Sequence, residues 1–194
     1  MSKSAASPDS HRARGREERR LRIIGGQWRG RKFRFPAVSV RPTPDRVRET
    51  LFNWLGQDLE GQATLDLFAG TGVLSLEALS RGASRAVAID RNPALVHALA
   101  ASAQTMGIRG LHAQIADARA WIGRDSDRYD VIFLDPPFAS DPWSWLLPAA
   151  AMRLAAAGLI YAEAGSALAP GPGLEIVRRD RAGHVHYHLL APRP

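Results

Sequence analysis

Cysteine is absent from the 194-residue sequence. Disulfides and thiolate metal sites both need cysteine, so the sequence excludes them. No apolar run approaches the roughly 20 residues that a helix needs to cross a bilayer. The first 20 residues also lack the apolar segment of a secretory signal. These absences favour a cytoplasmic protein with no membrane partner.

Acidic residues are scarce at the N-terminus. Residues 1–48 contain 14 Lys or Arg and 4 Asp or Glu, a net charge of +10, whereas the rest of the chain has a net charge of −3. Such a basic segment attracts polyanions such as nucleic acid. Residues 1–20 show no periodicity and predict a disordered tail. Their Arg and Ser content also resembles an organellar transit peptide, an interpretation that Glu17 and Glu18 weaken.

Residues 21–35 predict a short β-hairpin with two strands around its glycines. Cations and one tryptophan make this segment a candidate nucleic-acid contact. Its candidate residues are Arg22, Trp28, Arg29, Arg31, Lys32 and Arg34. A helix should follow, with Thr43 as its N-cap and Pro44 at its first helical position.

From residue 64 onward, strand patterns alternate with helical ones. Such alternation predicts a parallel sheet covered by helices on both faces. The expected strands are 64–68, 85–90, 111–117, 130–135 and 158–164, and the expected helices are 73–81, 93–106 and 142–156. Residues 174–180 and 184–190 flank an Arg-Ala-Gly turn and predict a terminal antiparallel hairpin.

A glycine-rich turn follows the first of these strands in the sequence LDLFAGTGVL, residues 65–74. Gly70 and Gly72 allow the backbone to approach a ligand closely, because neither has a Cβ. Asp66 can accept from the N–H groups of the turn or bind a ligand ammonium group, and Phe68 is a further candidate contact. Ligands of open parallel sheets bind at this carboxyl edge.

Two further acids end the next two strands. Asp90 is placed to bind the hydroxyls of an adenosine ribose, with Arg91 beside it. Asp117, followed by Ala118, can accept from an adenine N6 amine. A dinucleotide dehydrogenase is the competing interpretation, but Ser75 stands where its third glycine would be. A tight glycine turn without a ligand remains a further alternative.

The fourth strand ends in DPPF, residues 135–138. Pro136 and Pro137 stop the strand ladder and fix a bend, which could be their whole role. The Asp135 carboxylate and the Pro136 carbonyl can also accept from the two N–H bonds of an exocyclic base amine. They would stabilise the charge that develops as a methyl group arrives, while the Phe138 ring stacks on the base. This chemistry needs no metal ion.

These motifs resemble those of the bacterial 16S ribosomal RNA guanine-N2 methyltransferase family, over residues 21 to about 190. The resemblance rests on IIGGQWRGRK at 23–32, RPTPDRVRETLFNWL at 41–55 and DPPF at 135–138. It implies a Rossmann-like α/β fold: the seven-stranded class I methyltransferase sheet, mostly parallel with a reversed terminal strand, plus a small N-terminal β-hairpin. It also implies S-adenosylmethionine as methyl donor and 16S ribosomal RNA, within an assembled small-subunit particle, as acceptor.

The resemblance also implies roles for single residues and a division of the chain. Asp66, Gly70 and Gly72 match the cofactor loop of the family, Asp90 its ribose-binding acid, Asp117 its adenine contact and 135–138 its catalytic loop. We expect a tail at 1–20, an RNA-binding hairpin and helix at 21–56, and the methyltransferase domain at 57–194, acting as a monomer. The long N-terminal extension departs from the family.

Other functions remain open. A methyltransferase acting on adenine N6 in RNA or DNA would share the DPPF chemistry, although residues 140–194 leave little room for a DNA-recognition region. A protein-glutamine methyltransferase more often has Asn at the position of Asp135. A non-catalytic RNA-binding assembly factor would not need three acids at strand ends.

Histidines and tryptophans near the C-terminus leave two points open. His184, His186 and His188 alternate along the last strand. A solvated strand face is favoured there over a metal site. Trp143 and Trp145 either frame a substrate pocket or pack at the start of a helix.

Overall fold

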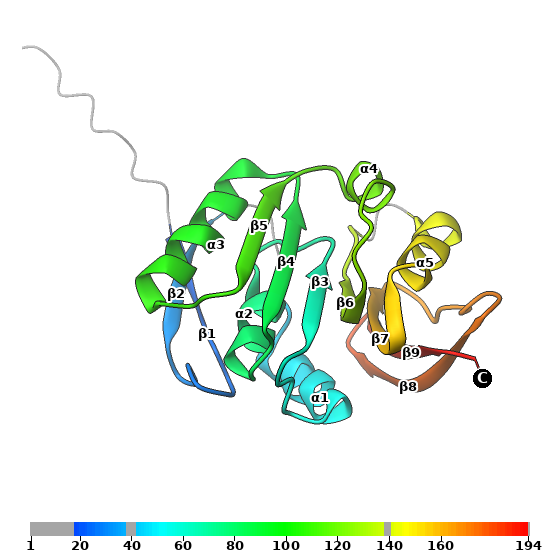
Figure 1. Cartoon of the computed structure of the whole chain (residues 1–194). Coiled ribbons are helices and arrows are strands. Elements are labelled where there is room, and N and C mark those ends of the chain that lie inside the picture. Colours follow the sequence, from blue (N-terminus) through cyan, green and yellow to red (C-terminus); the bar gives the residue numbers. More distant parts are fainter. Residues whose placement is uncertain (1–17, 38–41, 138–140, 194) are drawn as a thin grey trace, which may run out of the picture.

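The computed structural model describes residues 18–37, 42–137 and 141–193 (Figure 1). Phe138 and residues 1–17 of the predicted tail lie outside these ranges. In the described part of the chain, no helix is long and apolar enough to span a membrane.

A seven-stranded sheet forms the centre of the molecule, in the order β5-β4-β3-β6-β7-β9-β8. Strands β3 to β7 run parallel, whereas β9 is antiparallel to both of its neighbours, β7 and β8. The predicted sheet with a reversed terminal strand is therefore confirmed. The strands are β3 Ala63–Asp66, β4 Arg85–Asp90, β5 Leu111–Ile115, β6 Tyr129–Leu134, β7 Leu154–Ala164, β8 Leu174–Ala182 and β9 Val185–Pro192.

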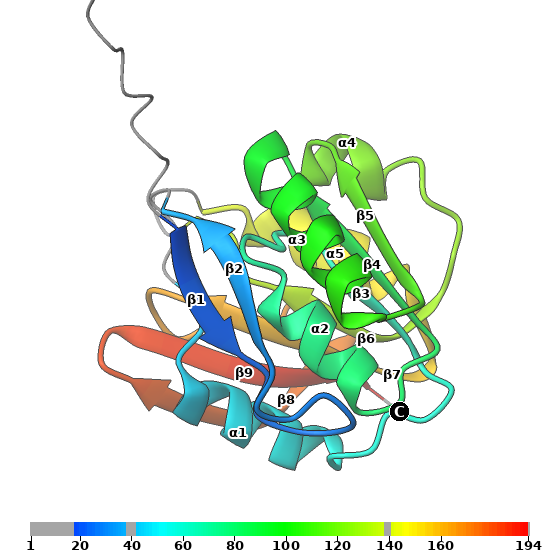
Figure 2. The ribbon, with the colours of Figure 1, turned by 90° about the vertical axis from the view of Figure 1, so that its left-hand side faces the viewer.

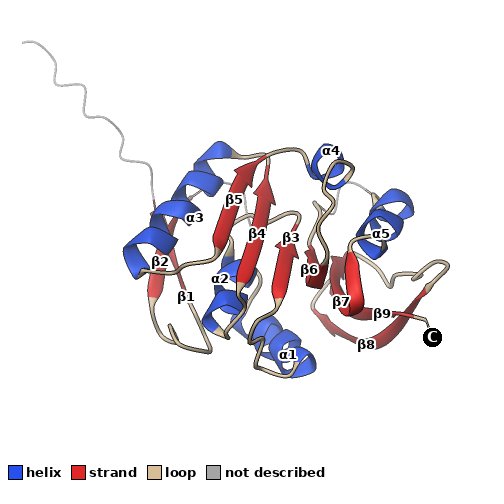
Figure 3. Ribbon diagram, in the orientation of Figure 1, coloured by secondary structure: helices blue, strands red, loops and turns tan. Residues whose placement is uncertain are grey.

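Helices cover both faces of this sheet (Figures 1 and 3). One apolar core joins the sheet to α1, α2 and α3 through residues such as Leu51, Leu76 and Leu99. The other joins it to α4 and α5 through Ile122 and Leu146. The helices are α1 Asp45–Leu55, α2 Val73–Ser80, α3 Pro93–Met106, α4 Ala118–Ile122 and α5 Trp143–Ala151.

The predicted N-terminal hairpin is a separate two-stranded sheet of β1 (Glu18–Arg22) and β2 (Lys32–Pro36), which lies beside α2 and α3 (Figure 2). Phe33 and Phe35 alternate toward the protein interior and are buried. The connecting loop is fastened to α2, because the Trp28 N–H donates to Ser80 Oγ at 2.9 Å. Gly26 has φ +70°, and a Cβ there would lie 1.8 Å from the Ser80 carbonyl oxygen. Only glycine fits this approach.

A buried ion-pair group, which we call the Glu77 cluster, joins the hairpin to α1 and α2. Glu77 forms ion pairs with Arg48 and Arg81, and all three side chains are almost fully buried. The Ile24 N–H also donates to Glu77 Oε1 at 2.7 Å. Arg81 additionally lies 4.0 Å from the centre of the Phe52 ring. Every oxygen of Glu77 is therefore engaged.

Several predicted boundaries need correction. Strand β1 begins at Glu18, so the last three residues of the predicted tail are in a strand. Helix α1 begins at Asp45, with Pro44 as its N-cap, and Thr43 does not cap it. Strand β7 begins at Leu154, where a helix was expected, because Leu154 pairs with Tyr129 of β6. Sheet pairing there outweighs the helix propensity of the alanines.

Candidate functional site

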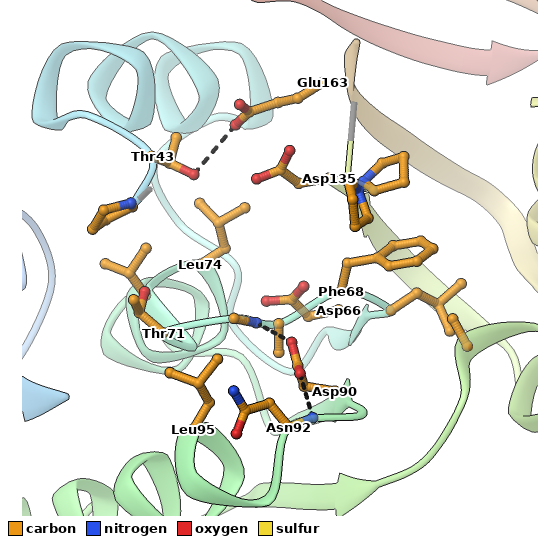
Figure 4. Close-up of a pocket in the computed structure, with 18 of the residues that line it drawn as sticks. Thr43, Asp66, Phe68, Thr71, Leu74, Asp90, Asn92, Leu95, Asp135 and Glu163 are labelled. Carbon is orange, nitrogen blue, oxygen red and sulfur yellow. Dashed lines mark hydrogen bonds between the residues drawn. The ribbon is translucent and has the colours of Figure 1, made fainter. Parts of the chain in front are cut away.

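A cavity of about 940 Å³ opens at the carboxyl ends of β3, β4, β5 and β6 (Figure 4). It lies where successive strands diverge, with β4 on one side of β3 and β6 on the other. This switch point is the usual ligand site of an open α/β sheet. The predicted residues that line it are Asp66, Phe68, Gly70, Asp90, Arg91, Asp117, Ala118, Asp135, Pro136 and Pro137.

Gly72 is the exception among the predicted cofactor residues, because it does not line the cavity. It is the N-cap of α2 with φ +74°, and a Cβ there would lie 2.3 Å from Leu99 Cδ1 of α3. A left-handed backbone conformation and close helix packing both require glycine here. Gly72 therefore fixes the conformation of the loop without lining the cavity.

Asp90 holds the glycine-rich loop against the end of β4. Its Oδ2 accepts from the Gly70 N–H at 2.8 Å, and its Oδ1 accepts from the Asn92 N–H, also at 2.8 Å. Both bonds are visible in Figure 4. They fix the carboxylate at the wall of the cavity, where each oxygen retains a further lone pair for a ligand hydroxyl.

Asp66 lies at the floor of the cavity and is 3% exposed. Burial, helped by the charges of Asp90 and Glu163, raises the pKa of its carboxyl group to about 7, although a hydrogen bond from Ser75 acts to lower it. Ser75, at the position that argued against a dehydrogenase, donates to Asp66 Oδ2 at 3.1 Å. A buried carboxyl with a raised pKa gains most from a cationic ligand, which would restore its charged form.

Asp117 ends the loop after β5 and caps α4. Its Oδ1 accepts from the Ala120 N–H at 2.9 Å. The cap fixes the side chain at the edge of the cavity, beside the buried Ala118. Helix α4 is a five-residue element that the sequence patterns did not reveal.

Asp135 follows β6 directly and shares the cavity with Asp66. Burial raises the pKa of its carboxyl group well above the usual value, and the charges of Glu163 and Asp66 raise it further. The two prolines after it also line the cavity. The bend therefore places Asp135, Pro136 and Pro137 in the same cavity as the three other acids.

One acid of this site was missed. Glu163, near the end of β7, is 4% exposed and lines the cavity. Its Oε1 accepts from the Tyr161 hydroxyl at 2.9 Å and from the Thr43 hydroxyl at 3.3 Å. A lone acid within the apolar segment 158–164 was the available signal. Trp145, for which the sequence left a substrate pocket and helix packing open, lines the cavity, with the Arg119 guanidinium 5.3 Å from its ring centre.

Comparison with known proteins shows to which family this chain belongs. Residues 21–191 match the family model described as "Conserved hypothetical protein 95". The chain belongs to this family. The predicted membership of a 16S ribosomal RNA methyltransferase family is confirmed, because its relatives include the ribosomal RNA small subunit methyltransferase D of Escherichia coli K12.

That relative is 43% identical over 119 residues, which make up 61% of this chain and 60% of the relative. The solved structure of yhhF from Escherichia coli, assigned as a methyltransferase, is 36% identical with a TM-score of 0.81, covering 89% of this chain and 98% of that one. The Thermus thermophilus 16S rRNA N2 G1207 methyltransferase, solved with AdoMet and guanosine, is 22% identical with a TM-score of 0.68. The alignment covers 92% of this chain and 50% of that one, and the likeness shows the fold alone.

The cations of this protein's N-terminal hairpin lie outside the cavity, and only some of them form ion pairs or hydrogen bonds. Arg22 pairs with Asp45 at 2.9 Å, and Arg34 pairs with Glu18 at 3.0 Å. Arg31 donates to the Met106 carbonyl oxygen at 3.2 Å. Two more cations, Arg29 and Lys32, are exposed and form no ion pair within the described ranges, and Trp28 packs partly buried against the first core.

The prediction that the histidines of the last strand lie on a solvated face is wrong for one of them. His188 is 1% exposed, and the segment at Leu168 lies against its ring. Its Nε2 accepts from the Leu168 N–H at 3.3 Å, which leaves the Nδ1 proton to face the Ala162 carbonyl oxygen. Burial lowers its pKa. Among the residues the structure describes, no group of three or more His, Cys, Asp or Glu is arranged to hold a metal ion.

Proposed function

We propose that the protein transfers a methyl group from S-adenosylmethionine to the exocyclic N2 amine of a guanine in 16S ribosomal RNA. It acts as a cytoplasmic monomer on an assembled small-subunit particle. One observation carries the proposal. The Asp135-Pro136-Pro137 bend opens into the same cavity as Asp66, Asp90 and Asp117.

The donor fits the residues of this cavity. Its volume of about 940 Å³ lies within the range of small-molecule sites and leaves space for a base beside the donor. Asp66 would bind the ammonium group, Asp90 the ribose hydroxyls, and Asp117 with Ala118 the adenine. Phe68 and Arg91 complete the walls. The acidic lining suits a ligand that carries both an ammonium and a sulfonium.

The bound donor supplies an electrophilic methyl group. Asp135 and the Pro136 carbonyl accept from the N–H bonds of the amine, which turns its lone pair toward that methyl group. Both acceptors stabilise the positive charge that develops on the nitrogen. Because its pKa is raised, Asp135 is also a suitable acceptor for the proton that the amine then loses.

Labelled methyl transfer tests the function. Small subunits from a strain lacking this protein are incubated with the purified protein and S-adenosylmethionine that carries a labelled methyl group. The RNA is then digested to nucleosides. We expect label in N2-methylguanosine at one position of 16S ribosomal RNA. Label in N6-methyladenosine, or none in RNA, would contradict the proposal, and parallel assays with naked RNA identify the preferred substrate.

Asp90→Ala should weaken binding of S-adenosylhomocysteine by about 1.5–3 kcal/mol, because charge-assisted hydrogen bonds to the ribose are lost. The loop anchored by the Gly70 N–H is released in the same variant. Calorimetry measures the affinity. Asp90→Asn is the matched control, since it keeps one acceptor oxygen and should lose less. Unchanged affinity in Asp90→Ala would remove Asp90 from the ribose site.

The division of the chain is part of the proposal. Residues 21–56 would dock the RNA, residues 57–194 would carry the reaction, and residues 1–20 would extend the basic N-terminus. The hairpin supports a docking role because Arg20 pairs with Arg34 and Arg22 with Lys32 across its two strands. Four cations thus share one face of a two-stranded sheet. Asp45 and Glu18 pair with two of them, Arg22 and Arg34, and the like charges directly opposite one another favour a bound anion.

The salt dependence of RNA binding tests the docking surface. If Arg22, Arg29, Arg31, Lys32 and Arg34 each neutralise one phosphate, log K against log salt should have a slope of about −3.5 to −4.5. Arg29→Ala should reduce that slope by about 0.7–0.9. Arg85→Ala is the control, because Arg85 lies outside the hairpin, at the start of β4, and pairs with Asp127. An Arg29→Ala slope equal to that of wild type would end the docking claim.

A further inference from the structure

Two carboxyl groups lie side by side at the end of the cavity where the base would bind. Strands β6 and β7 are parallel neighbours, with Phe133 opposite Tyr161 and Leu134 opposite Ala162. Continuing this register by one residue places Asp135 opposite Glu163. Side chains at paired positions of parallel strands point to the same face. In Figure 4 both carboxyl groups point into the same space.

Glu163 is fixed in its orientation. Two hydroxyl groups donate to its Oε1, one from Tyr161 of the same strand and one from Thr43, just before α1. Burial raises the pKa of Tyr161 well above the usual value, so the phenol keeps its proton and remains a donor. A side chain held this way cannot turn aside when a ligand enters.

The proposed reaction uses Asp135 and the Pro136 carbonyl for the target amine and leaves Glu163 without a role. Placing a second carboxylate beside the first is costly in a buried site, because each disfavours the charged form of the other. A ligand with a second N–H donor next to the amine would relieve that cost.

Only one of the bases that carry an exocyclic amine has such a donor. In guanine the C2 amine is flanked by the N1–H. In adenine and cytosine, the ring nitrogen on the Watson–Crick side of the amine carries no hydrogen and accepts hydrogen bonds. A carboxylate beside the amine therefore attracts guanine and repels adenine and cytosine. Base-modifying enzymes read an extruded base on this edge.

Resting on the function proposed above, we infer that Glu163 accepts a hydrogen bond from the N1–H of the target guanine and so determines which base enters the site. Asp135 then meets the N2 amine, and the two carboxylates together bind the two neighbouring donors. Thr43 and Tyr161 are positioning residues that act through Glu163. Thr43 lies just ahead of α1, so the segment linking the hairpin to the sheet contributes to base selection.

Nucleoside binding tests this inference with 2-aminopurine riboside, which keeps the C2 amine but has no hydrogen on N1. Calorimetry compares it with guanosine on the wild-type protein saturated with S-adenosylhomocysteine. We expect guanosine to bind about 10- to 100-fold more tightly, as for a hydrogen bond to a charged group. Glu163→Gln should abolish or reverse the preference, because the Oε1 of Gln still accepts from Thr43 and Tyr161 while its amide N–H groups face the base.

Three controls separate the possible outcomes. Tyr161→Phe removes one of the two supporting donors and should weaken the preference for guanosine, but less than Glu163→Gln does. Unchanged S-adenosylhomocysteine affinity shows that the Glu163→Gln site is intact. If Glu163→Gln does not fold, Glu163→Asp replaces it, since the shorter side chain withdraws the carboxylate and should also lose the preference. Equal or undetectable binding of the two nucleosides by the wild type, or a preference retained in the variant, overturns the inference. If wild-type protein labels guanine in 16S ribosomal RNA despite such a result, the proposed function stands and only the role of Glu163 falls.

Discussion

Asp135→Ala should lower the rate of methyl transfer about 100- to 1,000-fold, the usual cost of removing one acceptor that stabilises a developing charge. The affinity for S-adenosylhomocysteine should change little, because Asp135 is assigned to the target amine. Single-turnover kinetics with small subunits, together with calorimetry, would measure the two effects separately. A variant with nearly wild-type turnover would remove Asp135 from the reaction.

The pH dependence of the same step gives a second test of Asp135. Burial and the charges of Glu163 and Asp66 raise its pKa, so a larger fraction of the carboxyl group is protonated near neutral pH than for an exposed aspartate. Only the ionised carboxylate can accept a hydrogen bond from the amine and then take up the proton that the amine loses. The wild-type rate should therefore rise with pH through this raised pKa. Asp135→Asn keeps one acceptor oxygen, and should be less impaired than Asp135→Ala, with a flatter pH profile.

Glu77→Ala should lower the free energy of unfolding by about 3–5 kcal/mol, which is typical when one partner of a buried ion pair is removed. Arg48 and Arg81 both pair with Glu77, and their side chains are 0% and 3% exposed. The substitution leaves two buried guanidinium groups without their shared carboxylate, and it also removes the acceptor of the Ile24 N–H. Denaturant unfolding of the cofactor-free protein measures the loss.

Glu18→Ala is the matched control for that experiment. Glu18 pairs with Arg34, but the side chains are 53% and 63% exposed. An exposed ion pair is worth only about 0–1 kcal/mol, because water and salt screen it. Equal effects of the two substitutions would mean that burial does not determine how much the Glu77 cluster contributes to the free energy of unfolding. A large loss in Glu77→Ala alone would show that burial makes the Glu77 cluster important for the stability of the fold.

The sequence by itself determined the alternation of strands and helices and the residues at the strand ends. Strand β4 and helix α3 have the bounds that their periodicity predicts. The carboxyl ends of parallel strands meet at one edge of a sheet. Asp66, Asp90, Asp117 and Asp135 could therefore be assigned to one site before any contact was known, and the cavity contains all four.

Only the tertiary structure decided what each side chain meets. Glu163 is adjacent to Asp135 because β7 pairs with β6 in one particular register, which local sequence does not specify. His188 is buried because the distant segment at Leu168 lies against its ring, although the alternating histidines predicted a solvated strand face. Gly72 is required by the approach of Leu99 from α3. Periodicity records which face of an element is apolar, whereas the partner of that face depends on contacts between residues far apart in the chain.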